Sequence, residues 1–322
     1  MCKSYDGSNG CDVTMFTCQS SADECASDSD CTAQVPGNIC RYDAELKHFR
    51  CDPGGCVVGR PFLVEGEPRL APANPRADWR ELALLPRAVE LDVALRAHLA
   101  ERWTRVALME HASIAAFARF GLQLLSLGAP PELVELTTAA MADETRHAKA
   151  CFAIASQYAS APVGPGRLAV ESSLDDMSLE QIVRNTIREG CVGETVAALE
   201  AREAAEHAAD PALRALLLAI SEDETRHAAL AFRFVQWALS EGDAALGRAV
   251  RREFAALSEP AAESAELDAL QTASLAHGLV PEPMQKAVRA RAINDVILPC
   301  SRELFAAAVS GSAGAALDTS AP

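Results

Sequence analysis

The sequence predicts an all-α fold: a bundle of four long helices with a long crossover between the second and third helices, preceded by a small disulfide-rich module. From about residue 91 onward, Ala, Leu, Glu and Arg recur with helical periodicity. Helix start and stop residues divide this part into long helices joined by a short, a long and a short connection. By contrast, eight of the 11 cysteines lie in the first 56 of the 322 residues. The chain therefore joins two segments of different composition.

The first 56 residues form the predicted Cys-rich module. The segment is poor in aliphatic residues and too short to fold on hydrophobic burial alone, so it needs cross-links or a metal. No Cys-x-x-Cys pair occurs in it, which favours disulfides over a zinc site. Eight cysteines allow 105 pairings, and the spacing selects none of them. The eight are Cys2, Cys11, Cys18, Cys25, Cys31, Cys40, Cys51 and Cys56.

Disulfides indicate an oxidising compartment. We therefore expect an extracytoplasmic protein that is periplasmic, secreted or lipid-anchored, with a cytoplasmic location as the alternative. No basic segment followed by an apolar one, as in a signal peptide, precedes the cysteines. Met1-Cys2 suggests a bacterial lipoprotein with a lipid anchor at Cys2, although this leaves seven cysteines for pairing. A chain that starts late is the other explanation.

Five prolines in residues 57–90 exclude a long helix and predict an extended linker packed on a neighbouring segment. They are Pro61, Pro68, Pro72, Pro75 and Pro86. The first helix then runs from near Leu91 up to Gly128, a residue type that caps helix C-termini. Pro131 opens the second helix, which continues to about Tyr158.

Residues 159–177 form the predicted crossover. Ser178 begins the third helix with a capping box, and this helix ends near Ala209. Asp210-Pro211 then opens the fourth helix, which runs to about Ser240. Further helices are expected near 243–258 and 282–309. The predicted domains are a Cys-rich module at 1–56, a Pro-rich linker at 57–90, the bundle at 91–258, a C-terminal helical extension at 259–309 and a disordered tail at 310–322.

Composition limits the partners. Hydrophobic residues make up 49% of the chain and aromatic residues only 5%, so the core is mostly aliphatic. Lys and Arg total 29 against 45 Asp and Glu, a formal net charge of −16. An acidic chain without a basic patch is a poor ligand for nucleic acid. We therefore expect a small-molecule substrate and no nucleic acid, and the sequence leaves a homodimer open.

One six-residue sequence occurs twice, as residues 143–148 and 223–228, in the second and fourth helices: Asp-Glu-Thr-Arg-His-Ala. In each copy Glu and His are three residues apart, so both project from one face of the helix. The copies supply Glu144 and His147, and Glu224 and His227. Two such faces directed inward offer two carboxylates and two imidazoles, and one carboxylate from each remaining helix would complete a dinuclear metal site.

Hairpin geometry selects the other two carboxylates, because residues equidistant from the loop of a helical hairpin lie at the same height. Glu110, 18 residues before Gly128, matches Glu144, and Glu194, 17 residues before Pro211, matches Glu224. Glu189 is a rival to Glu194, but it lies five residues earlier, about 140° around an α-helix. The sequence leaves open whether Glu189 replaces or supplements Glu194.

Isolated charges on helices are usually solvated. Two identical copies, each with a matching Glu on the preceding helix and with apolar neighbours, favour a buried cluster instead. Four buried carboxylates need compensation, which two divalent cations and two neutral imidazoles provide. Mixed oxygen and nitrogen ligands favour iron, with manganese as a second option, over zinc or calcium.

The pattern Glu, Glu-x-x-His, Glu, Glu-x-x-His resembles the ferritin-like diiron-carboxylate superfamily over residues 91–240. The Asp-Glu-x-Arg-His form is most similar to its oxygen-activating branch, which includes the soluble acyl-carrier-protein desaturases. The resemblance implies that Glu144 and Glu224 bridge two iron ions. Glu110 with His147 would complete one metal, and Glu194 with His227 the other. Asp143 and Asp223 would orient the imidazoles, and Arg146 and Arg226 would neutralise these Asp residues.

The resemblance is compatible with several activities. A Cys-rich module and a Pro-rich arm fit an iron-storage shell poorly. The Cys-x-x-Cys electron-transfer module that is typical of related peroxidases is missing. Tyr158 lies about three turns beyond His147, which is too far from the metals for the radical tyrosine of a ribonucleotide-reductase subunit. We therefore expect a non-haem diiron oxidase, hydroxylase or desaturase that uses dioxygen, an unidentified organic substrate and, for a monooxygenase, an external electron donor. The alternative is a ferroxidase or another iron-binding envelope protein without an organic substrate.

Three further side chains lie close to these residues in the sequence. Trp103 precedes Glu110 by two helical turns and could line a substrate channel, although a core position is the commoner role of such a residue. Cys151 follows His147 by one turn, and Cys191 precedes Glu194 by about one turn. For both thiols we expect small apolar packing rather than ligation.

Overall fold

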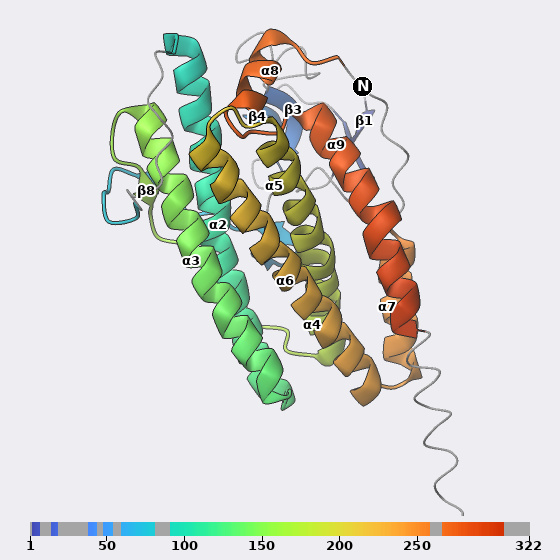
Figure 1. Ribbon diagram of the computed structural model, residues 1–322. Coiled ribbons are helices and arrows are strands. Elements are labelled where there is room, and N and C mark those ends of the chain that lie inside the picture. Colours follow the sequence, from blue (N-terminus) through green and yellow to red (C-terminus); the bar gives the residue numbers. More distant parts are fainter. Residues whose placement is uncertain are drawn as a thin grey trace, which may run out of the picture.

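A computed structural model describes residues 59–80, 91–257 and 266–305 in full, together with the backbone of four strands near the N-terminus. The described chain is mostly helical, which confirms the predicted α-class (Figure 1). The four strands pair as two antiparallel hairpins, β1 (Cys2–Asp6) with β2 (Thr14–Cys18) and β3 (Asn38–Asp43) with β4 (His48–Pro53). The cysteine side chains of the predicted disulfides and lipid anchor, and the predicted tail at 310–322, lie outside what the structure describes.

The first two long helices agree with the expected hairpin. Helix α2 (Val93–Leu127) begins at Asp92, whose carboxylate accepts hydrogen bonds from two backbone N–H groups of the first turn. It ends at Gly128, which adopts φ 68°, a conformation that glycine reaches without steric cost. Pro131 then opens α3 (Pro131–Ala159), which packs along α2 (Figure 1). Sequence and structure agree within two residues at each end.

The third long helix is helical without a break from Leu179 to His207, close to the predicted bounds, but it is not an α-helix throughout. Helix α4 (Leu179–Asn185) changes into a π-helix, η2 (Thr186–Glu194), and then into α5 (Thr195–His207). A π-helix bonds each residue to the fifth one along, so residues five apart lie closer to one face of the helix than they do in an α-helix. Helix α6 (Pro211–Glu241) packs against both η2 and α5, and also against α3. The insertion changes which side chains of this segment face inward.

Two glycines in η2 permit close packing. A Cβ at Gly190 would lie 2.5 Å from the Cβ of Ala231 on α6, and a Cβ at Gly193 would lie 3.1 Å from the carbonyl oxygen of Gly59. Neither glycine has the positive φ that requires glycine for conformational reasons. The two positions therefore need glycine for space.

We expect Gly190→Ala to destabilise the protein by about 1–3 kcal/mol, because a well-packed contact must move to admit the methyl group. Gly247→Ala is the matched control, since a Cβ at Gly247 in helix α7 (Ala244–Ala255) meets no atom within 4 Å. The free energy of unfolding of Gly247→Ala should rise by up to about 1 kcal/mol, because alanine has a better helix propensity than glycine. Urea denaturation followed by circular dichroism measures both changes, and equal effects would contradict the steric explanation.

The Pro-rich segment packs tightly on the helices. Its residues 59–64, here called the strap, end in β5 (Leu63–Val64), which pairs with β6 (Glu67–Pro68) in a short hairpin. Arg60 and Phe62 are 1% and 2% exposed. The guanidinium of Arg60 lies 4.7 Å from the ring centroids of both Phe117 and Phe120. Further along, β7 (Ala73–Asn74) pairs with β8 (Gly164–Pro165) in the crossover. The described residues 59–80 are therefore mostly extended and pack on the helices and the crossover.

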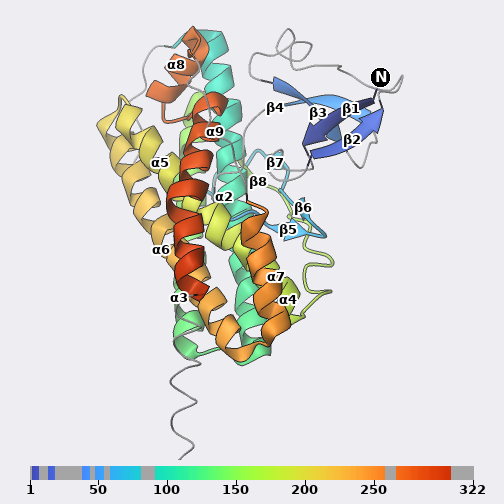
Figure 2. The ribbon, with the colours of Figure 1, turned by 90° about the vertical axis from the view of Figure 1, so that its right-hand side faces the viewer.

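The C-terminal part covers one side of the long helices (Figure 2). After α7 it comprises α8 (Ala269–Ala276), α9 (Glu282–Arg291) and a second π-helix, η3 (Ala292–Ile297), and helical backbone continues to residue 305. Helix α8 was not predicted, although Asp268 and Gln271 form a capping box that marks its start.

Two large apolar clusters fill the interior, and a smaller third one joins Phe62 and Val64 of the strap to α2. One large cluster contains Phe117, Phe120 and Phe234, and the other contains Trp103, Phe152 and Leu213. Along α2, α3 and α6, the buried acidic and histidine residues lie between the parts of the helix that contribute to the two clusters. A polar layer therefore interrupts the apolar core at mid-height.

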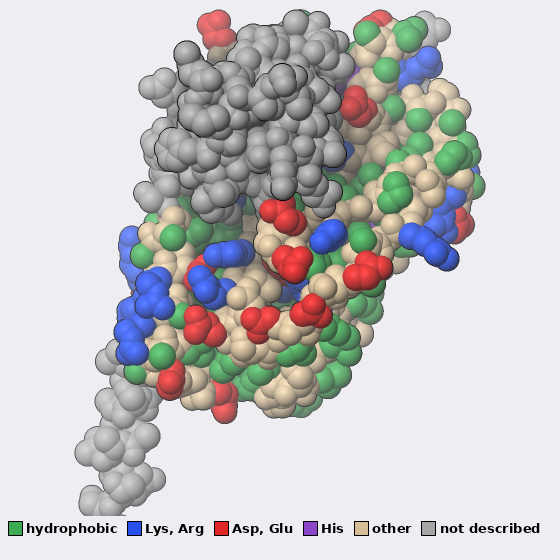
Figure 3. Space-filling view, turned by 180° about the vertical axis from the view of Figure 1, so that it is seen from behind, with side chains coloured by type: hydrophobic (Ala, Val, Ile, Leu, Met, Phe, Trp, Pro, Cys, Tyr) green, Lys and Arg blue, Asp and Glu red, His purple; other side chains and the backbone are tan. Residues whose placement is uncertain are grey.

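The surface of the described chain has mixed charge. On the face opposite that of Figure 1, acidic and basic side chains are interspersed (Figure 3). Within the described ranges, no helix combines the length and the apolar composition that a bilayer span requires.

Candidate metal centre

The polar layer brings together all six residues that the sequence indicated as ligands. Each is at most 3% exposed: Glu110 from α2, Glu144 and His147 from α3, Glu194 from the end of η2, and Glu224 and His227 from α6. Their ligand atoms form two overlapping groups, and within each group these atoms lie within 4.8 Å of one another. Glu144 and Glu224 belong to both groups. Glu110 and His147 complete the first group, and Glu194 and His227 the second.

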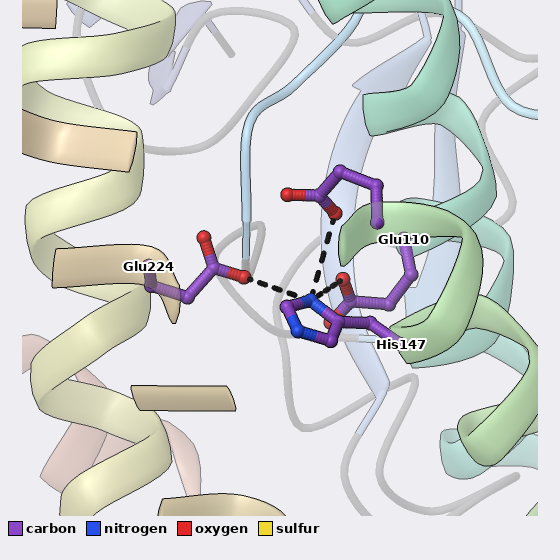
Figure 4. Close-up of side chains that lie close together, drawn as sticks. Glu110, His147 and Glu224 are labelled. Atoms are coloured by element: carbon purple, nitrogen blue, oxygen red, sulfur yellow. Dashed lines mark ion pairs between the residues drawn. The ribbon is translucent and has the colours of Figure 1, made fainter. Parts of the chain in front are cut away.

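The imidazole of His147 is directed at the first group of carboxylates (Figure 4). Its Nδ1 lies 3.6 Å from Oε2 of Glu110, 3.6 Å from Oε1 of Glu224 and 3.9 Å from Oε2 of Glu144. The corresponding Nδ1 of His227 lies 3.1 Å from Oε1 of Glu144 and 3.3 Å from Oε2 of Glu224. Both rings therefore present the same nitrogen to the cluster.

The outer nitrogen of each ring contacts an aspartate of the other repeat. Nε2 of His147 lies 2.9 Å from Oδ2 of Asp223, and Nε2 of His227 lies 3.2 Å from Oδ2 of Asp143. With Nε2–H donating to the aspartate, the lone pair of Nδ1 faces inward. The repeats are thus linked crosswise between α3 and α6, a connection that spacing within one repeat does not reveal.

Two arginines complete this crosswise network. Arg146 donates to Asp143 of its own helix at 2.7 Å and to Asp223 of the other helix at 3.2 Å. Arg226 donates to Asp223 of its own helix and to Asp143 at 3.4 Å. Both arginines are more than half exposed, so the network closes the polar layer on its solvent side.

The π-helix places Glu189 and Glu194 in different surroundings. Both are buried, although an α-helix would separate them by about 140°. Only Glu194 joins the cluster. Glu189 instead lies 2.5 Å from Nη2 of Arg119 and 3.6 Å from Nε of Arg60, and it accepts the backbone N–H of Leu63 in the strap. Glu189 therefore anchors the strap.

The cluster contains polar atoms that the protein itself does not satisfy. Buried atoms without a hydrogen-bond partner include both carboxylate oxygens of Glu144 and of Glu194, one oxygen each of Glu110 and Glu224, and Nδ1 of His147. Buried polar groups in folded proteins are normally paired, and an unpaired one is costly. These unpaired oxygen and nitrogen atoms converge on common points, as the ligands of bound cations do.

The electrostatics of the metal-free cluster are strongly coupled. Burial and the charge of Glu224 raise the pKa of Glu144 and of Glu194 well above their ordinary value. Burial also opposes ionisation of Glu224, but the nearby imidazoles of the two histidines hold its pKa well below the usual range. Protons therefore occupy part of the cluster when no metal is bound.

Acidic neighbours raise the pKa of both histidines. Burial alone would lower the pKa of His227, but its close contacts with Asp143, Glu144 and Glu224 raise it to about 12. Burial likewise opposes protonation of His147, and its acidic partners raise its pKa well above the ordinary value. Without metal, these acidic partners therefore favour the protonated, positively charged form of both rings.

We expect the free energy of unfolding of the chelator-treated protein to fall as the pH rises from about 5 to about 8, by up to about 1.4 kcal/mol per pH unit for each proton that unfolding releases. Groups with a raised folded pKa stabilise the fold below their unfolded pKa and lose that effect as the pH rises. This holds for Glu144, Glu194, His147 and His227. Urea titrations at each pH measure the trend, and a stability that increases over this range would contradict it.

A cavity of about 60 Å³ reaches the cluster from one side. Its lining includes Glu110 and, from the neighbouring turns, Trp103, Met109 and Cys151. Cys151 is fully buried, and burial raises the pKa of its thiol well above the ordinary value. Cys191 is also fully buried, within the apolar cluster that contains Phe117. Trp103 therefore belongs both to the core and to the cavity wall, and both thiols are packed in apolar surroundings.

Sequence reasoning missed the strap at this site. Ser113 on α2 donates to the carbonyl oxygen of Arg60 at 2.8 Å, and a Cβ at Gly59 would lie 3.9 Å from Oε2 of Glu110. The strap therefore passes beside a residue of the cluster. The prolines signalled an extended segment, but nothing in the sequence indicated where that segment lies.

Comparisons with protein-family models, with curated proteins and with solved structures give no match for this chain. The fold and the residues of the cluster therefore carry the functional argument.

Proposed function

We propose that the chain is a ferritin-like four-helix bundle with a dinuclear metal centre, and that it acts as a non-haem diiron oxidoreductase on a small organic substrate. The orphaned carboxylate oxygens and imidazole nitrogens of the buried cluster carry this proposal. Four glutamates bring four negative charges into a layer that the apolar core encloses. Two divalent cations offset these charges and occupy the points at which the unpaired atoms converge.

Each protein residue has a distinct part in holding the metals. Glu144 and Glu224 belong to both ligand groups and would bridge the two ions. Glu110 with His147 would complete one site, and Glu194 with His227 the other. Asp223 and Asp143 hold the proton of each imidazole at Nε2, which keeps Nδ1 available as a ligand.

When bound, two iron(II) ions supply electrons for the reduction of dioxygen. Hydroxylation of a C–H bond would consume dioxygen, two electrons from an external donor and two protons, and would form an alcohol and water. Desaturation would take two hydrogen atoms from the substrate as well and form two waters. The cavity beside Glu110 supports an organic substrate, because its lining is mainly apolar and includes Arg102 and Arg105. Such a wall is poorly suited to the entry of hydrated iron(II), which disfavours a ferroxidase.

Metal analysis and oxygen uptake test the proposal together. Chelator-treated protein is incubated anaerobically with iron(II), freed of excess metal and analysed for iron, and about two ions per chain are expected. On mixing with oxygenated buffer, this protein should consume dioxygen in a single phase. Less than one iron per chain would refute the centre. Repeated uptake on each addition of iron(II), with iron accumulating beyond two per chain, would support the ferroxidase instead.

We expect Asp223→Ala to weaken metal binding about 10- to 100-fold, because a ligand histidine loses the partner that orients its ring. The crosswise link predicts that this substitution on α6 affects the site of His147 on α3. Titration with cobalt(II), followed by its visible absorption, would show one weakened and one retained site. Asp243→Ala, at the exposed N-terminus of α7, is the control and should change neither site.

A further inference from the structure

The strap brings a positive charge into the interior beside the metal-binding cluster. Arg60 and Arg119 are both buried, and both lie beside the one carboxylate of Glu189, at 3.6 Å and 2.5 Å. Two guanidinium groups and one carboxylate have a net charge of +1. Arg119 takes the shorter ion pair, whereas Nε and Nη1 of Arg60 have no hydrogen-bond partner among the described residues. The uncompensated charge is therefore centred on Arg60.

The backbone of the strap lies against the turn of η2 that carries Glu194. A Cβ at Gly193, the residue before Glu194, would lie 3.0 Å from Cδ of Pro61 and 3.1 Å from the carbonyl oxygen of Gly59. Arg60 lies between these two strap residues, and its carbonyl oxygen accepts the hydroxyl of Ser113. Its position beside η2 is therefore fixed from both sides.

The side chain of Arg60 is directed at the same half of the cluster. Its Nη1 lies 3.3 Å from the position of a Cβ at Gly190, four residues before Glu194. Its guanidinium lies 4.7 Å from the ring centroid of Phe117, and that ring lies edge-on against the imidazole of His227 at 5.1 Å. The contacts of Arg60 thus lead to Glu194 and His227, which belong to one of the two ligand groups.

A buried charge in this position acts on a bound cation. Burial lowers the pKa of Arg60, and the charges of Glu189 and then Glu194 oppose this effect. Charges in the interior are screened much less than exposed ones, so the guanidinium repels a metal ion held by Glu194. The repulsion is stronger for a trivalent ion than for a divalent one, which favours iron(II) over iron(III).

We propose that Arg60 is a positioning residue of the metal centre, whose charge weakens cation binding at the half formed by Glu194 and His227 and favours the iron(II) state. The inference deepens the proposed function and rests on it, since it concerns the same centre. Iron(II) is the state that reacts with dioxygen, so an arginine in this position keeps the centre ready for the reaction. The strap is then part of the metal centre as well as of the fold.

Titration with cobalt(II), followed by its visible absorption, tests the effect on each half. Glu110→Ala retains the ligands Glu194 and His227, and in this background Arg60→Met should strengthen cobalt binding at least about tenfold. Glu194→Ala retains the other half, and there Arg60→Met should change the affinity less than about threefold. Unchanged or weaker cobalt binding by Arg60→Met in the Glu110→Ala background would overturn the inference.

Two further variants separate charge from structure. Arg60→Lys retains the charge and should keep the wild-type affinity within about threefold. Arg233→Met removes an exposed charge and should leave the affinity unchanged. Arg60→Met leaves Glu189 paired with Arg119, so circular dichroism should show folded protein. Equal changes in Arg60→Met and Arg60→Lys would mean that packing, not charge, controls the affinity, and would refute the proposal.

The reduction potential of the iron-loaded protein gives a second readout. Spectroelectrochemical titration should show a lower potential in Arg60→Met than in the wild-type protein, and a wild-type potential in Arg60→Lys. An equal or higher potential in Arg60→Met would contradict the assigned role. Two cobalt ions per chain with no effect of Arg60→Met would leave the metal centre intact and refute only this inference, whereas a wild-type protein that binds no cobalt would refute the centre itself.

Discussion

Glu144→Ala is expected to lower the iron content from about two ions per chain to about zero, because Glu144 belongs to both ligand groups. Glu110 belongs to the first group only. Glu110→Ala should therefore impair one site and leave the other, so that about one ion per chain remains. The difference between the two variants distinguishes a shared carboxylate from a terminal one.

Anaerobic loading with iron(II), gel filtration and metal analysis measure both effects. Glu135→Ala is the control, since Glu135 is exposed on the same helix and outside the cluster. Circular dichroism should show folded protein for each variant, because removing a buried carboxylate also removes an unfavourable buried group. Two retained ions in Glu144→Ala would exclude this residue as a bridge, and equal loss in both alanine variants would contradict the division into two groups.

The positions of the cluster residues could be predicted because helical spacing is regular. Glu and His three residues apart share a face of a helix, and the turns of the two hairpins set the heights of Glu110 and Glu194. The structure brings these residues together as that geometry requires. Repetition of the same six residues at one height in α3 and α6 carried this information directly in the sequence.

The environment of the cluster depended on contacts that spacing does not encode. In an α-helix, Glu189 and Glu194 would point in different directions, but in the π-helix η2 both side chains are buried. Glycines at 190 and 193 were the available signal, because small residues permit close approach, yet they do not specify the type of helix. The crosswise Asp–His pairs likewise join residues 76 and 84 positions apart, which only the packing of α3 on α6 determines.

The second large effect is expected for Glu189→Ala, which should destabilise the protein by about 3–5 kcal/mol. The substitution leaves Arg60 and Arg119 buried without their shared counterion, since these side chains are 1% and 4% exposed. It also removes the acceptor for the backbone N–H of Leu63. The strap should then separate from the helices at a lower denaturant concentration than the wild-type protein tolerates.

Denaturation with urea measures this loss of stability, because urea is uncharged and does not screen the ion pairs as guanidinium chloride would. Glu132→Ala is the control, because its pair with Arg233 is mostly exposed and should contribute no more than about 1 kcal/mol. Replacing Glu189, Arg60 and Arg119 together by methionine should recover much of the lost stability, since an apolar set avoids the desolvation of three charges. A loss as small as that of Glu132→Ala would show that the strap is not held by these charges.

The iron content of Glu189→Ala gives an independent result. Because Glu189 lies outside both ligand groups, the folded variant should still bind about two ions per chain, whereas Glu194→Ala should lose one. If Glu189→Ala instead lost metal while its stability was unchanged, Glu189 would be a ligand and Glu194 would not. Measuring stability and metal content in the same pair of variants therefore separates the residue that anchors the strap from the residue that would hold a metal, although both arise from one turn of the π-helix.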